Sequence, residues 1–440
     1  MRKIEEKIEN RSAKIGIIGL GYVGLPLATS FAEAGFNVLG FDAQQAKVDA
    51  VNQGKSHIAD IAGERLAAVL AKRVFEATAD PARLSEADAV CICVPTPLTS
   101  TKEPDLSYVK HVSEDLSRCL RPGQVIILES TTYPGTTREV ILPILRRSGL
   151  KLDTDFYLAF SPERVDPGNN IYTLKNTPKI VGGISPASTR LAAMLYRQVA
   201  DNVVPVTGPE VAEMTKVFEN VFRSVNIALV NEMSLLCEKM GISIWEVIDS
   251  AATKPFGYTP FYPGPGVGGH CIPLDPYYLA NKAREYDFHT RFIELAAEIN
   301  ENMPYYVVTR VMEALNGQGK ALQNAGVLVL GVAYKKDSDD SRESPALKII
   351  KLLHDKGARV SYSDPYIKKI TNFAGGLESV SITRENLSAT DCLIIATDHS
   401  CYDLKQIAAW SPLVFDTRGI TRKLKDQANI VRLGENERYH

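Results

Sequence analysis

The stretch "AKIGIIGLGYVGLPLATSFAEAGFNVLGFD", residues 13–42, decides the fold. A short apolar run enters the turn Gly19-Leu-Gly21-Tyr-Val-Gly24, and an amphipathic helical pattern follows that Gly35 is expected to cap. A second apolar run then ends in Asp42. A GxGxxG turn between a strand and a helix, with an acidic residue about 20 positions further on, is typical of a dinucleotide-binding βαβ unit.

This turn has the chemistry that a pyrophosphate requires. Its glycines would permit a tight turn and let the phosphates approach the N-terminus of the helix, where backbone N–H groups point outward. Asp42 would accept hydrogen bonds from the adenosine ribose, and its charge would repel a 2′-phosphate. The sequence therefore predicts NAD rather than NADP as the cofactor. The alternative is a glycine-rich turn in an unrelated α/β domain.

Three further segments continue the alternation of strands and helices. They are "ADAVCICVPTP" (87–97), "VIILEST" (125–131) and "FYLAFSPERV" (156–165), each a predicted buried strand that ends in a polar loop. This alternation predicts a parallel, doubly wound sheet, in which ligands bind at the carboxyl ends of the strands. Each polar residue there is by itself more typical of a capping or solvated residue, but their common location indicates a ligand site. These residues are Thr96, Glu129, Thr131 and Glu163.

Composition restricts the kinds of partner. The 440 residues carry a formal net charge of −2, so no large field would attract nucleic acid or an anionic membrane. No run approaches the roughly 20 apolar residues of a membrane span, and the opening "MRKIEEKIENRS" does not resemble a signal peptide. The 7 cysteines form neither a disulfide framework nor a metal-ligand spacing. We expect a cytoplasmic protein of two or three domains with reduced thiols.

A long helix is predicted from Pro209 to Gly241. Its apolar residues follow helical spacing, while Lys216, Asn220 and Ser224 form a separate stripe at intervals of four. Either this stripe is solvated, or Lys216 and Asn220 lie beside a reactive group and stabilise a developing oxyanion. The sequence leaves both interpretations open. A helix of this length also suggests a spacer between two domains or a dimerisation element.

The segment from Ala325 onward repeats the opening pattern of strand, glycine, loop, helix, glycine, strand and aspartate. It lacks the full GxGxxG pattern and carries Lys335, Lys336 and Arg342 in its loop, and Arg418 follows a later predicted strand. Cations at strand ends would suit a second phosphate-bearing ligand, and the alternative is a charged surface loop. Two nucleotide-like domains joined by one helix predict two nucleotide ligands that meet in the cleft between the domains.

The loop "YPGPGVGGHCIPLDPYYL" (262–279) holds Cys271 in a segment too rich in Gly and Pro for ordinary helix or strand. A thiolate adds readily to an aldehyde, and oxidation of the hemithioacetal gives a thioester that water can hydrolyse. Two successive oxidations, from alcohol to acid, would explain the cysteine. The alternative is that Cys271 is a small buried apolar residue. Glycines that expose backbone, with His270 and Asp275 nearby, argue against inert burial, and His270 is the weaker candidate for a chemical role.

Five motifs, taken in order, resemble the UDP-glucose/GDP-mannose dehydrogenase family: "GLGYVGLPLA", "SPERVDPG", "EMTKVFENVFRSVNIALVNE", "GGHCIPLDPYYL" and "GVAYKKDSDDSRESPAL". The resemblance implies two Rossmann-like, doubly wound α/β domains joined by a long central helix. The implied segments are an NAD-binding domain (1–206), a helical linker and dimerisation region with the Cys271 loop (207–318), and a UDP-sugar-binding domain (319–440). It also implies a homodimer or higher homo-oligomer and a two-step oxidation of a sugar C6 alcohol to a carboxylate.

The resemblance implies roles for individual residues. Cys271 matches the nucleophile, and Lys216 and Asn220 match the pair that holds the reacting oxygens. Asp275 matches an aspartate that supports proton transfer, while Thr131 and Glu163 match residues linked to water activation and thioester hydrolysis. The implied cofactor-binding residues are Gly19, Gly21, Tyr22, Val23, Gly24, Asp42, Lys47, Pro95, Thr96, Thr131 and Arg342. The implied substrate-binding residues are Glu163, Arg164, Lys216, Asn220, Tyr262, Gly268, Lys335 and Arg418, and no metal is implied.

The sequence around the cysteine also indicates a branch of the family. "GGHCIPLDP" resembles enzymes that act on UDP-N-acetylamino sugars, and the run Phe261 to Glu285 looks most like UDP-N-acetylglucosamine 6-dehydrogenases. UDP-N-acetylmannosamine dehydrogenase and UDP-glucose dehydrogenase are the alternatives. The product is expected to enter surface polysaccharide, either lipopolysaccharide O-antigen or capsule. A single-step hydroxyacid dehydrogenase and a catalytically silent nucleotide-sugar sensor remain as competing functions.

Overall fold

The computed structural model describes residues 1–58, 61, 63–99, 101–165, 169, 171–269, 272–371, 373, 376–424 and 427–435. The predicted nucleophile Cys271 and its neighbour His270 lie outside the described residues. The chain divides into two compact units. The N-terminal unit comprises Met1–Glu219 and Tyr277–Phe288, and the C-terminal unit comprises Asn220–Pro276 and His289–His440. Among the residues that the structure describes, no helix is long and apolar enough to cross a membrane.

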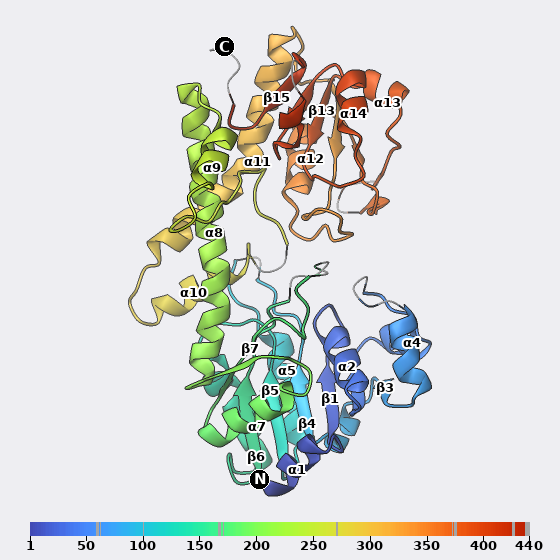
Figure 1. The fold of residues 1–440 in the computed structure, drawn as a ribbon, viewed down its shortest axis with the longest axis vertical. Helices are drawn as coiled ribbons and strands as arrows, with labels where there is room; N and C mark the ends of the chain where they lie inside the picture. Colours follow the sequence, from blue (N-terminus) through green and yellow to red (C-terminus); the bar gives the residue numbers. More distant parts are fainter. Residues whose placement is uncertain are drawn as a thin grey trace. The chain divides into compact units, whose positions relative to one another are not determined.

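The N-terminal unit is built on an eight-stranded sheet in the order β3-β2-β1-β4-β5-β6-β7-β8 (Figure 1). Its strands are parallel except where β6 meets β7. The chain passes from β1 to β2 on one side and later returns to β4 on the other, which creates the switch point where such sheets bind ligands. The strands are β1 (Lys14–Ile18), β2 (Asn37–Phe41), β3 (Phe75–Thr78), β4 (Ala89–Ile92), β5 (Gln124–Leu128), β6 (Phe156–Phe160), β7 (Lys179–Gly183) and β8 (Val203–Val206).

Helices cover both faces of this sheet, so its central strands β4, β5, β6 and β7 are buried on both sides. Side chains alternate along a strand, so Ile17 belongs to a core with α1, α2 and α7, while Ile18 belongs to a second core with α5 and α6. The helices are α1 (Arg2–Glu9), α2 (Gly24–Glu33), α3 (Gln45–Asn52), α4 (Gly63–Ala71), α5 (Ser107–Cys119), α6 (Leu142–Leu145) and α7 (Pro186–Tyr196). Short turns of other helix types are η1 (Pro81–Glu86), η2 (Thr137–Ile141) and η3 (Arg146–Ser148).

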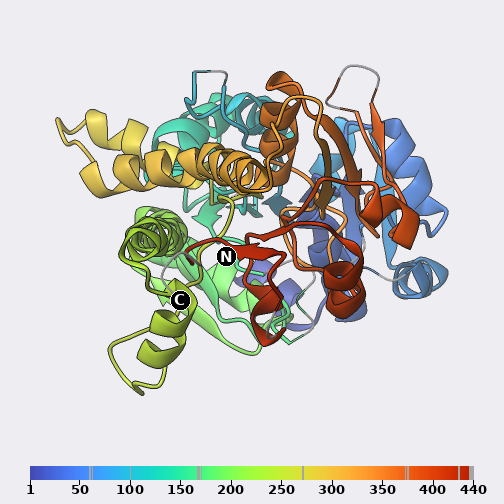
Figure 2. The same cartoon turned by 90° about the horizontal axis from the view of Figure 1, so that it is seen from above.

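The predicted long helix is α8 (Pro209–Met240), an uninterrupted helix of 32 residues. Figure 2 looks along it. Its exposed face is an apolar stripe of residues 41% to 65% exposed: Val211, Met214, Phe218, Phe222, Leu229, Leu236 and Met240. The opposite face buries polar side chains, namely Glu213, Asn220, Ser224, Asn231 and Glu238. The stripe of Asn220 and Ser224 is therefore not solvated, and Lys216 is half-buried.

The C-terminal unit contains a five-stranded parallel sheet in the order β10-β9-β13-β14-β15. Val329 of β9 packs with α11 and α12 on one face, and Leu330 packs with α13 and α14 on the other. The strands are β9 (Gly326–Leu330), β10 (Arg359–Ser363), β13 (Cys392–Ile395), β14 (Val414–Asp416) and β15 (Ile430–Arg432), with a separate antiparallel pair, β11 (Lys369–Ile370) and β12 (Leu377–Glu378). Its helices are α9 (Ile244–Ala251), α11 (Arg291–Gly317), α12 (Pro345–Asp355), α13 (Arg384–Ser388), α14 (Leu404–Trp410) and the turn η4 (Ile420–Lys423). The helix α10 (Asp275–Arg284) begins in this unit and continues in the N-terminal one.

The last described residues are bonded to the start of α9. Trp245, whose side chain is fully buried, donates its indole N–H to the carbonyl of Leu433 at 2.8 Å. Ile244 N–H donates to the carbonyl of Gly434 at 3.2 Å, and Ser243 Oγ donates to Glu435 at 2.6 Å. These contacts attach residues 433–435 to the first turn of α9 within the C-terminal unit.

The expected α/β fold with two nucleotide-type parallel sheets and a long helix is confirmed. The boundaries expected at residues 206 and 318 stay a prediction. The compact units divide the chain at Glu219 and assign most of α10 to the N-terminal unit.

Candidate functional site

The glycine-rich turn after β1 is shaped by close backbone contacts. Gly19 has φ +91°, and a Cβ there would lie 2.6 Å from the carbonyl oxygen of Cys93. A Cβ on Gly24, the first residue of α2, would lie 1.8 Å from the carbonyl oxygen of Gly19. Gly21 instead faces open space, with no atom within 4 Å of its Cβ position. The first and third glycines therefore allow the turn to close, and the second leaves room for a ligand against the backbone.

Asp42 follows β2 and contacts this turn directly. Its Oδ2 accepts the N–H of Leu20 at 3.1 Å, and its Oδ1 accepts the N–H of Gln44 at 2.9 Å. Lys47 on α3 lies 3.7 Å from Oδ2, and Asp42 is 8% exposed. Each carboxylate oxygen has lone pairs beyond the one used by a backbone N–H, so Asp42 can also accept ribose hydroxyls. The open Gly21 and the placement of Asp42 fit NAD.

The strand ends beside the turn are connected to each other. Thr96 follows β4, and its hydroxyl donates to the carbonyl of Thr131, which follows β5, at 2.8 Å. Pro95 is exposed and Thr96 is buried. Tyr278 on α10 donates its hydroxyl to the carbonyl of Thr96 at 2.6 Å. The predicted cofactor residues Thr96 and Thr131 are thus brought together, and Tyr278, near the end of the cysteine loop, is hydrogen-bonded to Thr96.

Glu163, at the end of β6, belongs to a buried ionic network. Its Oε1 accepts the N–H groups of Arg164 at 2.7 Å and Val165 at 2.6 Å, while its Oε2 lies 3.6 Å from the Lys179 ammonium. Lys179 at the start of β7 also contacts Glu129 at 2.6 Å. Burial acts to raise the pKa of Glu163, but Lys179, the two backbone N–H groups and Lys216 together hold it below its ordinary value. Glu163 is therefore an ionised carboxylate.

Lys216 and Arg164 place the adjoining turn of α8 beside this network. The charge of Lys216 is close enough to Glu163 to act on its pKa. The Arg164 guanidinium contacts Glu219, also on α8, at 2.6 Å and donates to the carbonyl of Pro178 at 2.7 Å. The structure thus brings Glu163, Arg164 and Lys216 together at one end of the parallel strands.

The C-terminal unit holds the other predicted pair. The Asn220 amide donates to Asp275 Oδ2 at 2.5 Å, and these two side chains are 5% and 3% exposed. Asn220 lies on α8 and Asp275 opens α10. A buried carboxylate requires hydrogen-bond donors to remain ionised. Asn220 supplies one of them and fixes the orientation of Asp275.

The described part of the cysteine loop, up to Gly269, packs against the segment that follows β9. Gly269 N–H donates to the carbonyl of Arg342 at 3.0 Å, and a Cβ on Gly268 would lie 2.7 Å from Tyr334 Cβ. Gly264 N–H donates to Asn231 Oδ1 at 3.0 Å. The loop is glycine-rich because its backbone lies directly on other chain segments, not because it is loose.

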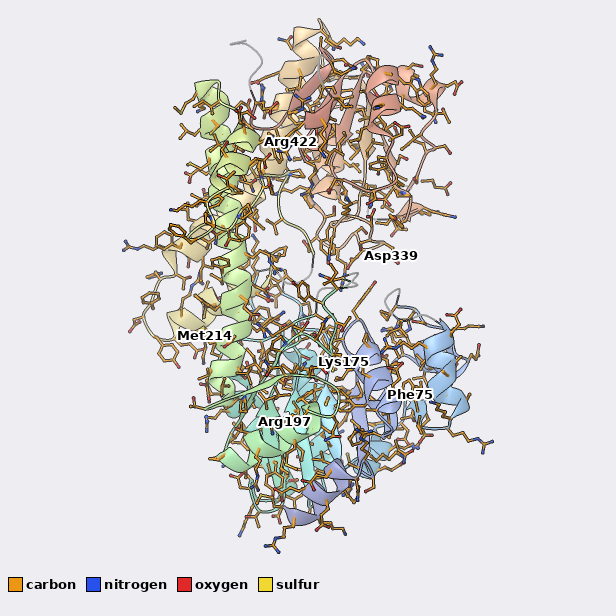
Figure 3. The ribbon with its side chains drawn as sticks, in the orientation of Figure 1. Phe75, Lys175, Arg197, Met214, Asp339 and Arg422 are labelled. Carbon is orange, nitrogen blue, oxygen red and sulfur yellow. The ribbon has the colours of Figure 1, made fainter. Side chains whose placement is uncertain are left out.

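Four other predicted residues of the C-terminal unit make contacts that do not involve Asn220 or Asp275. Tyr262 stacks on Trp245 with ring centroids 6.1 Å apart and donates to Asp249 at 2.9 Å, beside Arg422, which Figure 3 labels. Arg418 donates from Nε to the carbonyl of Ala396 at 2.8 Å and approaches the Cβ position of Gly264 to 2.9 Å. Arg342 donates from Nε to Asp340 Oδ1 at 2.9 Å and from Nη2 to Oδ2 at 2.5 Å, which makes a bidentate pair, and Lys335 is half-buried.

No local sequence signal marks some of the residues that complete these arrangements. Lys179 and Tyr196 become neighbours of Glu129 only when β5, β7 and α7 pack, and Tyr278 lies far along the chain from Thr96. Asn231 lies in the predicted helix, where no pattern distinguishes it from its neighbours. Glu129 is one of the strand-end residues that indicate a ligand site, but its contacts with Lys179 and Tyr196 do not follow from that position.

Models of one family match three consecutive parts of the chain. The NAD-binding domain of the UDP-glucose/GDP-mannose dehydrogenase family matches residues 13–200, its central domain residues 210–302, and its UDP-binding domain residues 328–423. The N-terminal sheet with the Gly21 opening is thus an NAD-binding domain, and the C-terminal sheet is a UDP-binding domain.

Individual relatives agree with these matches. The chain is 38% identical to the UDP-N-acetyl-D-mannosamine dehydrogenase of Pyrococcus horikoshii, over 88% of this chain and 89% of the relative. It is 35% identical to an NDP-N-acetyl-D-galactosaminuronic acid dehydrogenase of Ralstonia nicotianae, over 92% and 96% of the two chains. The solved structure of a UDP-D-ManNAc dehydrogenase from Pyrococcus horikoshii superposes with a TM-score of 0.88 at 34% identity and covers 96% of this chain and 99% of that one. The chain therefore belongs to the UDP-glucose/GDP-mannose dehydrogenase family and is an NAD-dependent nucleotide-sugar 6-dehydrogenase.

Proposed function

We propose that this nucleotide-sugar dehydrogenase oxidises the C6 alcohol of a UDP-N-acetylhexosamine to a carboxylate in two successive steps. The named relatives favour UDP-N-acetyl-D-mannosamine, which we place first. The resemblance of residues 261–285 to UDP-N-acetylglucosamine 6-dehydrogenases keeps UDP-N-acetyl-D-glucosamine as the second candidate. We further propose that the uronate product enters a surface polysaccharide.

The observation that carries the proposal is the surroundings of two carboxylates, the partly exposed Glu163 and the buried Asp275, together with the chemistry of the cysteine loop. Glu163 is ionised and held by two backbone N–H groups, and Asp275 is held by Asn220. A single alcohol oxidation needs one base and no thiol, whereas conversion to an acid also needs a nucleophile and an activated water. Glu163, Asp275 and Cys271 meet these needs.

NAD, when bound at Gly21 and Asp42, supplies the oxidant for both steps. The Lys216 ammonium and the Asn220 amide donate hydrogen bonds to the C6 oxygen, where negative charge develops. The Cys271 thiolate adds to the carbonyl carbon of the aldehyde, and a C–S bond forms as the C=O π bond opens. The oxygen then takes up a proton from solvent, which gives a hemithioacetal. After the second oxidation Cys271 holds a thioester, and Glu163 takes a proton from water as the water attacks. The C–S bond then breaks, the thiolate leaves, and the acid is released.

The proposal also assigns three segments and an assembly. Residues 1–206 bind NAD, residues 207–318 carry the cysteine loop and the interface helix, and residues 319–440 bind the UDP moiety. The remaining predicted contacts, from Arg164, Tyr262, Gly268, Lys335, Arg342 and Arg418, serve the nucleotides. The apolar stripe of α8 is proposed to pack against a second copy in a homodimer, because its seven apolar residues are exposed along the whole helix.

A substrate panel tests the function. The purified protein is given NAD with UDP-N-acetylmannosamine, UDP-N-acetylglucosamine, UDP-N-acetylgalactosamine or UDP-glucose, and NADH and acid are both measured. We expect turnover of an N-acetylated sugar with two NADH per acid, and loss of acid formation in Cys271→Ser. One NADH per product would indicate a single-step dehydrogenase, and saturable binding without turnover would indicate a sensor.

A further inference from the structure

The buried ionic network behind Glu163 contains more groups than the proposed mechanism uses. Lys179, Glu129 and Tyr196 lie in the core of the N-terminal unit, with exposed fractions of 2% or less. Lys179 contacts Glu129 at 2.6 Å, and Glu129 also accepts the hydroxyl of Tyr196. The Lys179 ammonium further lies 5.1 Å from the centroid of the Tyr196 ring. Burying charged groups is unfavourable unless they are paired, so such a cluster calls for an explanation.

Glu163 is the member of this network that reaches the surface. Its side chain is 15% exposed, whereas the side chains of Lys179 and Glu129 are 2% and 0% exposed. One oxygen of Glu163 is fixed by two backbone N–H groups and the other faces Lys179 at 3.6 Å. The buried Lys179 ammonium therefore lies closer to Glu129, which is fully buried, than to Glu163, which is partly exposed and can contact a ligand.

We propose that Lys179, locked in place by Glu129 and Tyr196, is a positioning residue that keeps Glu163 aligned and ionised for the step in which water releases the acid. This inference rests on the proposed function of Glu163. Glu129 holds the Lys179 ammonium in position, and the Tyr196 hydroxyl orients Glu129 through a hydrogen bond. The positive charge of Lys179 then keeps Glu163 ionised. None of these three groups needs to touch the sugar.

The titratable neighbours of Glu163 agree with this division of roles. They are Lys179 on β7, Lys216 on α8, Glu129 after β5, and Cys93 after β4, with Tyr196 on α7 behind them. The pKa of Glu129 is raised, first by burial and then by Glu163, with Lys179 opposing. The pKa of Lys179 is raised by its two carboxylates despite its burial, so the ammonium keeps its charge. Glu129 and Glu163 thus compete for the Lys179 ammonium. Removing the charge of Lys179 should therefore raise the pKa of Glu163, and removing the charge of Glu129 should lower it.

The experiment compares Lys179→Met with Glu129→Gln. The carboxyl ¹³C resonance of Glu163, assigned with Glu163→Gln, is titrated in protein labelled at glutamate and free of substrate. In Lys179→Met we expect the pKa of Glu163 to rise by roughly 1–3 units, the size of effect of an opposite charge at this distance. In Glu129→Gln we expect it to fall, because the competing anion is gone. Lys175→Met, which removes an exposed charge from the same unit (Figure 3), should leave it unchanged.

A second readout follows the reaction. At the acidic end of the pH range, Lys179→Met should accumulate a sugar adduct on Cys271, detected by intact mass, while wild type releases acid. The inference would be overturned if the pKa of Glu163 in folded Lys179→Met equals that of wild type. It would also be overturned if this pKa changes equally and in the same direction in both variants. If Lys179→Met does not fold, Glu129→Gln decides alone, since a structural pair would leave Glu163 unmoved. Failure of wild type on every UDP-sugar would refute the proposed function, whereas the titration needs no turnover.

Discussion

Asp364 occupies the same topological position in the C-terminal unit as Asp42 does in the N-terminal unit. Each follows the second strand of a βαβ unit, and its Oδ2 accepts the N–H of the residue after a left-handed glycine, at 2.7 Å from Val332 and 3.1 Å from Leu20. Asp364 differs because it also bonds Ala333, Tyr366, Ile367 and His399. A carboxylate has about four lone-pair sites, so Asp364 is saturated while Asp42 can still accept a ligand.

Asp42→Asn should therefore weaken cofactor binding without unfolding the protein. Losing charge-assisted bonds of about 1.5–3 kcal/mol would raise KM for NAD by roughly tenfold or more and reduce the preference over NADP. Steady-state kinetics with both cofactors measures this. Asp364→Asn is the matched control, and it should lower the free energy of unfolding by roughly 3 kcal/mol or more, seen in urea denaturation. An unchanged KM in Asp42→Asn would contradict the assignment.

Lys216→Met should lower kcat by roughly 10²- to 10³-fold, because in the proposed mechanism it removes a donor to the oxygen where charge develops. Its half-buried position predicts little change in the unfolding free energy. Steady-state kinetics and thermal denaturation separate the two effects. Lys239→Met, an exposed lysine of the same helix, should behave as wild type. Equal kcat values in the two variants would remove Lys216 from the mechanism.

Phe218→Glu combined with Phe222→Glu should convert the expected dimer into monomers. The two side chains are 65% and 50% exposed on the apolar stripe of α8, and buried glutamates at an interface would remain unpaired. Light scattering after gel filtration measures the molecular mass. Arg223→Glu, exposed but off the stripe, should leave the mass unchanged. A dimer that survives the double substitution would place the interface elsewhere.

Glu213 predicts a pH-dependent stability. Burial raises its pKa to about 7, although the N–H groups of Gly135 and Thr137 oppose the shift. A raised folded-state pKa contributes stability that is complete below the unfolded value, about 4.5, and is lost as pH rises through about 7. Glu213→Gln should therefore remove roughly 3 kcal/mol of the pH dependence between these limits. Urea midpoints across this range measure it, and parallel curves for the two proteins would refute it.

What the sequence predicted well was local. The turn from Gly19 to Gly24 and the aspartate after β2 are recognisable because their spacing along the chain sets their geometry, and both occur as expected. The Asn220–Asp275 contact joins two motifs that resemblance had related in role but not in space.

What the sequence could not predict depends on packing between distant segments. Helical spacing predicted α8 and the polar stripe with Asn220 and Ser224, but not that this stripe is buried. Nor did it separate the buried Val217 from the exposed Phe218, because only neighbouring elements decide which face a helix buries. Lys179 could not be found as a partner of Glu163, since nothing in "TPKIVGG" indicates that β7 runs antiparallel beside β6. Lys179 is a neighbour of Glu163 because β7 pairs with β6 in the sheet, and local composition carries no sign of that pairing.

The bonds from Trp245 to Leu433 and from Ser243 to Glu435 bear on how the protein is synthesised. The donor and acceptor of the Trp245–Leu433 bond are separated by 188 residues, so this bond can form only after Leu433 has been synthesised. A chain that lacks residues 433–435 would leave the buried indole N–H of Trp245 without its acceptor. A buried donor without an acceptor is destabilising, so such a chain should form a less stable C-terminal unit.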